Sequence, residues 1–242
     1  IHDRTATVRI RLKQHRGKGR PDAEVKLSAK SFNTDVVHEI PVVSRRVKLK
    51  KGQAEVEVVL DMGEKMQLWD EFNPALYELT AEVSSEYGTD KQTRAFGMRE
   101  FKIDGKMFYV NGRLIQLRGT VENCDFPLTG YAPMDEESWE RVFRICRSYG
   151  LNHMRFHSFC PPEAAFAAAD RMGFYLQPEG PSWPNHGVKL GERNVHRPLF
   201  DGRNTAHEQG VWQLCFVLHD GLRQRTGGQL GGLGERFRGL LE

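Results

Sequence analysis

The sequence predicts a multidomain protein, an antiparallel β-sandwich followed by an α/β segment. In residues 1–99, apolar and charged residues alternate in short runs that are separated by turn-forming residues, as in half-buried antiparallel strands. From residue 100 to residue 192, strand patterns alternate with helix patterns, which is typical of a parallel sheet. Residues 193–242 show neither pattern. The sequence therefore predicts three regions, with boundaries after residues 99 and 192.

Three segments of the first region show the alternation most clearly. Apolar residues occupy every second position in each: Val8, Ile10 and Leu12; Val56, Val58 and Leu60; Tyr77, Leu79 and Ala81. In the basic segment 45–51, Val47 and Leu49 alternate with Arg and Lys, which indicates the wet face of a strand and not a nucleic-acid-binding surface. Several short strands at this spacing predict a sandwich of immunoglobulin-like size.

The second region contains five predicted elements. They are a strand at 112–120, a helix at 134–150, a strand at 151–157, a helix at 161–173 and a strand at 174–180. Asp135 can cap the first helix, and Gly150 and Gly173 suit the left-handed positions that end helices. Phe156 and Phe166 are predicted core residues. This order favours a parallel sheet, in either a doubly wound fold or a (β/α)₈ barrel.

The composition is that of ordinary soluble globular material. Of the 242 residues, 39% are hydrophobic, and the formal net charge is +3, which gives no sign of a nucleic-acid partner. No apolar run approaches the roughly 18 residues that a membrane helix needs. The N-terminus has no initiator Met and no apolar signal core, so we expect a start inside a longer chain and read no compartment or oligomeric state. The four cysteines form no CxxC pair, which favours isolated thiols without zinc.

The motifs of residues 67–183 resemble those of a known enzyme family. "FYVNGRLIQLRGT", followed by "MDEESWERVFRICRSYGLNHMRFH" and "FYLQPEG", is similar to glycoside hydrolase family 2, which includes β-galactosidases, β-glucuronidases and β-mannosidases. The preceding "LWDEFNPALYELTAEV" and "GTDKQTRAFGMREF" resemble the last strands of that family's sandwich. The resemblance implies an immunoglobulin-like sandwich at 1–99 and the first three βα units of an incomplete TIM (β/α)₈ barrel at 100–192.

The resemblance also implies one wall of a sugar-binding site. In a barrel, the residues that follow the strands face a shared mouth, and here they are Asn123, Asp125, Arg155, His157, Glu179 and Trp183. Amide, carboxylate, imidazole and guanidinium groups can bind the hydroxyls of a β-linked oligosaccharide or glycoside, and an indole can stack on its ring.

Each of these residues has an alternative interpretation. Arg155 can be a structural partner of Glu179 inside the barrel mouth. His157 has no second ligand at helical or strand spacing, so it is interpreted as a hydrogen-bonding wall residue and not as a metal ligand. Asp125 can simply cap the turn that follows it, and Trp183 can be part of loop packing.

Two departures from the family pattern leave the sugar unassigned. Asn123 stands where the family often has a His, and His157 lies one position earlier than the usual His of the second strand. The resemblance implies no organic cofactor. Some relatives use a structural Mg²⁺ or Na⁺, but its ligand pattern is not evident here. Family habit favours a periplasmic or secreted protein.

The resemblance implies catalytic residues that the first 192 residues do not supply. Retaining glycosidases use two carboxylates about 5–5.5 Å apart, and in this family both come from later strands, the acid/base from an Asn-Glu pair that ends the fourth. Glu179 matches the third-strand acid, which assists binding. We therefore expect an inactive fragment of a retaining exo-β-glycosidase with no catalytic residue of its own. The alternative is a non-catalytic sandwich that binds carbohydrate or protein.

The composition of residues 193–242 indicates a shifted reading frame. This region contains seven Arg, no Lys and nine of the 24 glycines. One codon choice for residues 219–227, read one nucleotide later, encodes "MMAYGNEP", which resembles the family's fourth strand with its Asn-Glu pair. The same shift converts the segments on either side into a plausible family sequence. The alternative is a genuine low-complexity tail.

We predict that DNA sequencing through the codons for Gly191 to Gly228 will find one inserted or missing base. Restoring it should open a frame that encodes "AYGNEP" and continues downstream. The same frame, confirmed in several independent clones, would contradict the frameshift hypothesis.

Overall fold

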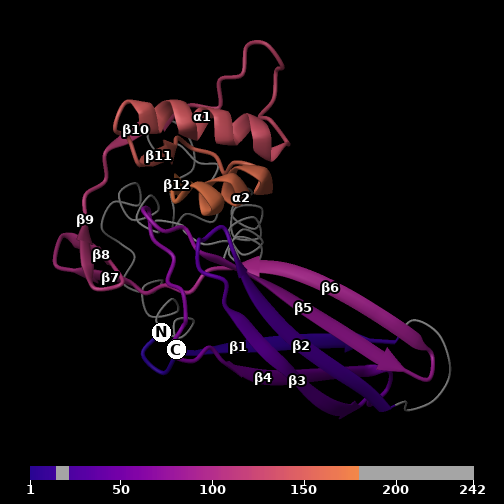
Figure 1. Cartoon of the computed structure of the whole chain (residues 1–242). Helices are drawn as coiled ribbons and strands as arrows, with labels where there is room; N and C mark the ends of the chain where they lie inside the picture. Colours follow the sequence, from indigo (N-terminus) through magenta and orange to yellow (C-terminus); the bar gives the residue numbers. More distant parts are fainter. Residues whose placement is uncertain (15–21, 180–242) are drawn as a thin grey trace, which may run out of the picture. The chain divides into compact units, whose positions relative to one another are not determined.

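The computed structural model describes residues 1–14 and 22–179 and divides into two compact units (Figure 1). The first unit comprises Ile1–Ile115, and the second begins at Gln116. Residues 100–115, which the sequence pattern groups with the α/β region, are counted with the first unit. Trp183 and the Arg/Gly-rich stretch at 193–242 lie outside the described residues.

Two antiparallel sheets form the body of the first unit. One pairs β1 (Thr5–Lys13) with β4 (Gln53–Asp61). The other has the order β3-β2-β5-β6 and is built from β3 (Glu39–Lys48), β2 (Asp22–Phe32), β5 (Leu76–Ser85) and β6 (Gly88–Phe96). In Figure 1 these six strands run as long, twisted ribbons.

Apolar side chains from both sheets share one core, so the first unit is a β-sandwich. Val25 and Leu27 of β2, Val58 and Leu60 of β4, and Tyr77 of β5 are almost fully buried and belong to one contiguous cluster. Val8, Ile10 and Leu12 of β1 pack against it while partly buried. The period-two prediction for β1, β4 and β5 is confirmed.

Strand β6 lies at the open edge of the four-stranded sheet. Among the described residues it pairs with β5 alone, and each of its residues from Gly88 to Ala95 is exposed. Because neither face is buried, its sequence "GTDKQTRAF" has no apolar alternation. Charged residues on an edge strand discourage pairing with a strand of another molecule.

A small antiparallel sheet ends the first unit. It consists of β7 (Phe101–Asp104), β8 (Met107–Val110) and β9 (Arg113–Ile115). The turn residue Asn111 fixes this sheet, because its Oδ1 accepts the Glu100 N–H at 2.9 Å and its Nδ2 donates to the Trp69 carbonyl at 3.0 Å. Trp69 is fully buried, so the hydrogen bond attaches the sheet to the interior of the unit.

The described part of the second unit, residues 116–179, contains a three-stranded parallel sheet and two helices. Its elements are β10 (Gly119–Glu122), α1 (Glu136–Ser148), β11 (His153–Phe156), α2 (Glu163–Met172) and β12 (Tyr175–Pro178), with the strand order β10-β11-β12. The prediction of one strand at 112–120 is wrong, because that stretch contributes β9 to an antiparallel hairpin and β10 to the parallel sheet. The change of pairing partner breaks the strand.

The two predicted helices are present with the expected end signals. Asp135 Oδ1 accepts the Ser138 N–H at 2.8 Å at the start of α1, and Gly150 just after the helix has a φ of 76°. Gly173 ends α2 at a φ of 64°. Neither helix of the described residues is long and apolar enough to cross a membrane.

Both helices pack against one face of the parallel sheet. Phe143 of α1 and Phe166 of α2 join Met154, Phe156 and Leu176 of the strands in a single buried cluster. The prediction that Phe156 and Phe166 are core residues is confirmed, since they are 0% and 2% exposed.

The opposite face of the sheet carries a buried histidine against a glycine. His153 of β11 is 7% exposed, and burial lowers its pKa to about 4, opposed by a hydrogen bond with Gln177 and helped by the Arg155 guanidinium. The imidazole is therefore neutral near pH 7. A Cβ added to Gly119, its register partner on β10, would lie 2.3 Å from His153 Nδ1. The ring thus requires glycine at position 119.

We predict that Gly119→Ala destabilises the second unit by about 1–3 kcal/mol, because the added methyl group overpacks against the imidazole. Urea unfolding followed by circular dichroism measures the change. The control is a double-variant cycle in which the cost of the Gly119→Ala change should fall when His153 is also replaced by Ala. An equal cost in both backgrounds would show that His153 is not the cause.

Candidate functional site

The carboxyl ends of β10, β11 and β12 lie along one edge of the sheet. The register pairs Glu122 with Phe156 and Phe156 with Pro178, so the residues that follow these positions leave the sheet at the same edge. Five of the six predicted site residues lie on this edge or just beyond it: Asn123, Asp125, Arg155, His157 and Glu179. Trp183, the sixth, lies outside the described residues.

Arg155 and Glu179 form an ion pair across this edge. Arg155 Nε donates to Glu179 Oε1 at 2.7 Å, and an Nη of the same guanidinium lies 2.6 Å from that oxygen. The Glu179 side chain is 5% exposed, whereas that of Arg155 is 30% exposed. The pairing that the sequence offered as an alternative role for Arg155 is present. It leaves part of the guanidinium accessible to a ligand.

The backbone of Ser158 completes the cradle of the carboxylate. Its N–H donates to Glu179 Oε2 at 2.8 Å, so N–H groups of two residues hold both oxygens. Ser158 adopts a φ of 63°, which is uncommon for a residue with a side chain. Its hydroxyl lies 3.2 Å from His157 Nδ1. Ser158 therefore contacts Glu179 through its backbone N–H and His157 through its hydroxyl.

Glu122 organises the loop that carries Asn123 and Asp125. Its carboxylate accepts the Cys124 N–H at 3.1 Å and the Asp125 N–H at 3.2 Å, while Cys124 adopts a φ of 61°. The alternative role of Asp125, which is to cap the turn that follows it, stays a prediction. Asn123 and Asp125 are both exposed and are available to a ligand.

His157 connects the second strand to this loop. Its N–H donates to the Glu122 carbonyl at 2.8 Å, which extends the parallel pairing by one residue, and its side chain is half-buried. Within residues 1–14 and 22–179, no three His, Cys, Asp or Glu side chains gather as metal ligands. Hydrogen bonds link Glu122 to His157, His157 to Ser158, and Ser158 to Glu179. They form one continuous edge that runs from the loop after β10 to Glu179.

The cysteines near this edge do not offer a ready thiolate. Burial raises the pKa of Cys160 to about 12, and its Sγ donates to the Pro161 carbonyl at 3.6 Å. Slight burial and the neighbouring Glu122 carboxylate also raise the pKa of Cys124. Because the thiolate is the nucleophilic form, neither residue is prepared for covalent catalysis.

Sequence reasoning missed the contributions of Glu122 and Ser158. The signal for Glu122 was a carboxylate at the end of a strand, directly before the turn-forming "NCD". Ser158 acts through its N–H at a positive φ, a conformation that its residue type does not announce. Both residues position their neighbours, Glu122 through its carboxylate and Ser158 through its backbone N–H.

Comparison with known proteins shows similarity to one family of enzymes. Residues 1–99 match the family model described as Glycosyl hydrolases family 2. The chain is 32% identical over 141 residues to a beta-galactosidase of Thermoanaerobacterium thermosulfurigenes, an alignment that covers 55% of this chain and 19% of that protein. It is 31% identical over 121 residues to a beta-galactosidase of Staphylococcus xylosus, covering 50% and 12%.

Residues 1–99 thus match glycoside hydrolase family 2, and the chain is similar to part of two beta-galactosidases. A crystal structure of a Bacteroides uniformis beta-glucuronidase has the same fold, with a TM-score of 0.68 at 17% identity, over 98% of this chain and 29% of that one. The family resemblance of the sequence motifs is thereby confirmed. The chain spans less than a fifth of either galactosidase, so it corresponds to a limited part of the family 2 enzymes it matches.

We predict that Glu179→Ala destabilises the second unit by about 1–3 kcal/mol, because it leaves the partly exposed Arg155 guanidinium and the Ser158 N–H without their acceptor. Glu179→Gln should cost less, since an amide oxygen still accepts hydrogen bonds. Urea unfolding measures both. Glu163→Ala, at an exposed position at the start of α2, is the control. A Glu179→Ala change within about 0.5 kcal/mol of the parent would show that the ion pair is not structural.

Proposed function

We propose that this chain is part of a retaining exo-β-glycosidase that removes terminal sugars from a β-linked oligosaccharide or glycoside. The observation that carries the proposal is the Arg155–Glu179–Ser158 cluster at the carboxyl edge of parallel strands, in a chain whose residues 1–99 match family 2. The names of the matched beta-galactosidases support this substrate class. The particular sugar is left open.

The parallel sheet supports an incomplete (β/α)₈ barrel after an immunoglobulin-like sandwich. In the described residues, β10 and β12 each pair on one side only, and the helices pack on a single face. On the other face His153 Nε2 is buried without a hydrogen-bond partner among the described atoms. A barrel would place that face inside a ring of further strands, where the remaining polar groups are satisfied.

The exposed edge groups form one wall of the proposed sugar site. Asn123 and Asp125 offer amide and carboxylate groups to hydroxyls, and Arg155 offers its accessible N–H groups. His157 adds an imidazole at the centre of the edge. Glu179 is proposed to bind substrate and to orient Arg155. Trp183 keeps its proposed role as a stacking surface.

We propose that the catalytic carboxylates come from other parts of the whole enzyme. Retention requires a nucleophile and an acid/base about 5–5.5 Å apart. Glu179 is held by Arg155 and Ser158, and this arrangement suits positioning better than proton transfer. The chain by itself is then inactive, and its edge supplies binding contacts alone.

The test is to assay this chain, and the full-length protein from the repaired gene, on nitrophenyl β-glycosides. We expect no hydrolysis by the chain alone and hydrolysis with retention by the repaired enzyme. In that enzyme, Asn123→Ala should lower kcat/KM about five- to tenfold, since it removes one exposed hydrogen-bonding group. Its Tm should not change.

Leu128→Ala is the matched control, because Leu128 is 98% exposed on the same loop. It should leave kcat/KM and Tm unchanged. Hydrolysis by the chain alone would refute its inactivity, and a repaired enzyme inert on every β-glycoside would refute the proposed function.

A further inference from the structure

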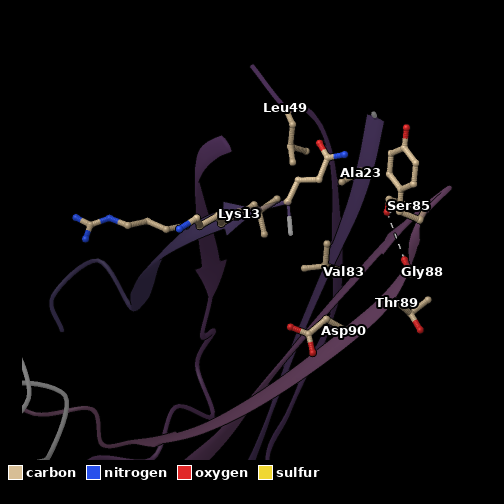
Figure 2. Close-up of a pocket in the computed structure, with 12 residues that line it drawn as sticks. Lys13, Ala23, Leu49, Val83, Ser85, Gly88, Thr89 and Asp90 are labelled. Carbon is tan, nitrogen blue, oxygen red and sulfur yellow. Dashed lines mark hydrogen bonds between the residues drawn. The ribbon is translucent and has the colours of Figure 1, made fainter. Parts of the chain in front are cut away.

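The sandwich contains a separate cavity at the end where β1 stops and the β5–β6 hairpin turns (Figure 2). Its volume is about 470 Å³, within the usual range of small-ligand pockets, about 300–1,000 Å³. The lining residues lie between Arg11 and Asp90, so the cavity belongs to the first unit and shares no residue with the site on β10–β12.

In the described residues, this cavity is lined by strands of two sheets of unequal width. One sheet has four strands and the other has two, and β6 forms the edge of the wider one. Asp90 of β6 is the register partner of Val83 of β5, and Figure 2 shows both side chains on the same side of these strands. The Asp90 carboxylate therefore lies beside the apolar interior, at a place that the narrower sheet does not cover.

The walls of the cavity combine an apolar floor with a polar rim. Ala23 and Leu49 are buried at 4% and 6% exposure and form the floor together with Val83. Asp90 is exposed, and Tyr87, on the hairpin turn, is 47% exposed. This combination matches a ligand with one apolar face and several hydroxyl groups, as a pyranose ring has.

The charges around the cavity favour a neutral ligand. Asp90 disfavours an anion, while Arg11 and Lys13, which also line the cavity, disfavour a cation. In Figure 2 the Lys13 side chain extends away from Val83 and Asp90, so it contributes positive charge at the rim without filling the space. A carboxylate can accept hydrogen bonds from two adjacent hydroxyls.

We propose that this cavity is an accessory binding site for one or two sugar units of a neutral carbohydrate. It holds a saccharide without cleaving it and is independent of the proposed hydrolytic activity. Asp90 accepts hydrogen bonds from vicinal hydroxyls, the floor residues contact the apolar ring face, and Tyr87 borders the opening.

The test is an NMR titration of the isotope-labelled chain with galactose, glucose and lactose. We expect saturable shift changes at the amides of Val83, Ser85 and Asp90, with a Kd in the millimolar range. Asp90→Asn should weaken binding at least fivefold. The asparagine Oδ1 can still accept the Lys91 N–H, which donates to Asp90 Oδ1 at 2.9 Å in the parent, so the local fold is kept.

Glu78→Gln is the matched control, since Glu78 is exposed on the same sheet and does not line the cavity. It should bind as the parent does. Equal weakening by both variants, tighter binding of glucuronate or arginine amide, or no saturable change near Val83 would overturn the proposal. Shifts confined to residues 119–179 would also overturn it while supporting the proposed edge site, so the two proposals fail separately.

Discussion

The second unit depends on the compensation of one buried carboxylate. Glu179 is 5% exposed, and burying an ionised carboxylate without partners is costly. Arg155 and the Ser158 N–H supply those partners, but only when the ends of β11 and β12 are in register. The same requirement explains the left-handed backbone at Ser158, where the cost of an uncommon φ is offset by a hydrogen bond to a charged group. The backbone conformation at Ser158 also helps to fix the position of His157, the residue before it, whose ring contacts the Ser158 hydroxyl.

Sequence pattern predicted the strands that bury one face and missed the features that depend on pairing. Strands β1, β4 and β5 alternate because the core excludes polar side chains from every second position. Strand β6 has no such signal, since both of its faces meet solvent. The stretch 112–120 reads as one strand because its apolar residues are compatible with either sheet. Only the pairing of β9 with β8 and of β10 with β11 divides it.

The location of the site was easier to predict than its internal contacts. Parallel strands bring their carboxyl ends to one edge, so Asn123, Arg155 and Glu179 could be grouped from topology and family motifs. The structure adds the hydrogen bonds that hold them, and backbone N–H groups provide much of this network. Every residue except proline has an N–H, so residue type does not reveal which of them Glu122 or Glu179 accepts. Only the backbone conformation in the structure shows which N–H groups these two carboxylates accept.

The polar edge of the sandwich has a consequence for synthesis of the protein. β6 is synthesised before any strand of the second unit, and its outer backbone groups are then exposed. An apolar strand in that position would recruit neighbouring nascent chains. With Asp90, Lys91 and Arg94 exposed along it, the edge repels such partners. The polar edge thus lowers the risk of aggregation while the rest of the polypeptide is synthesised.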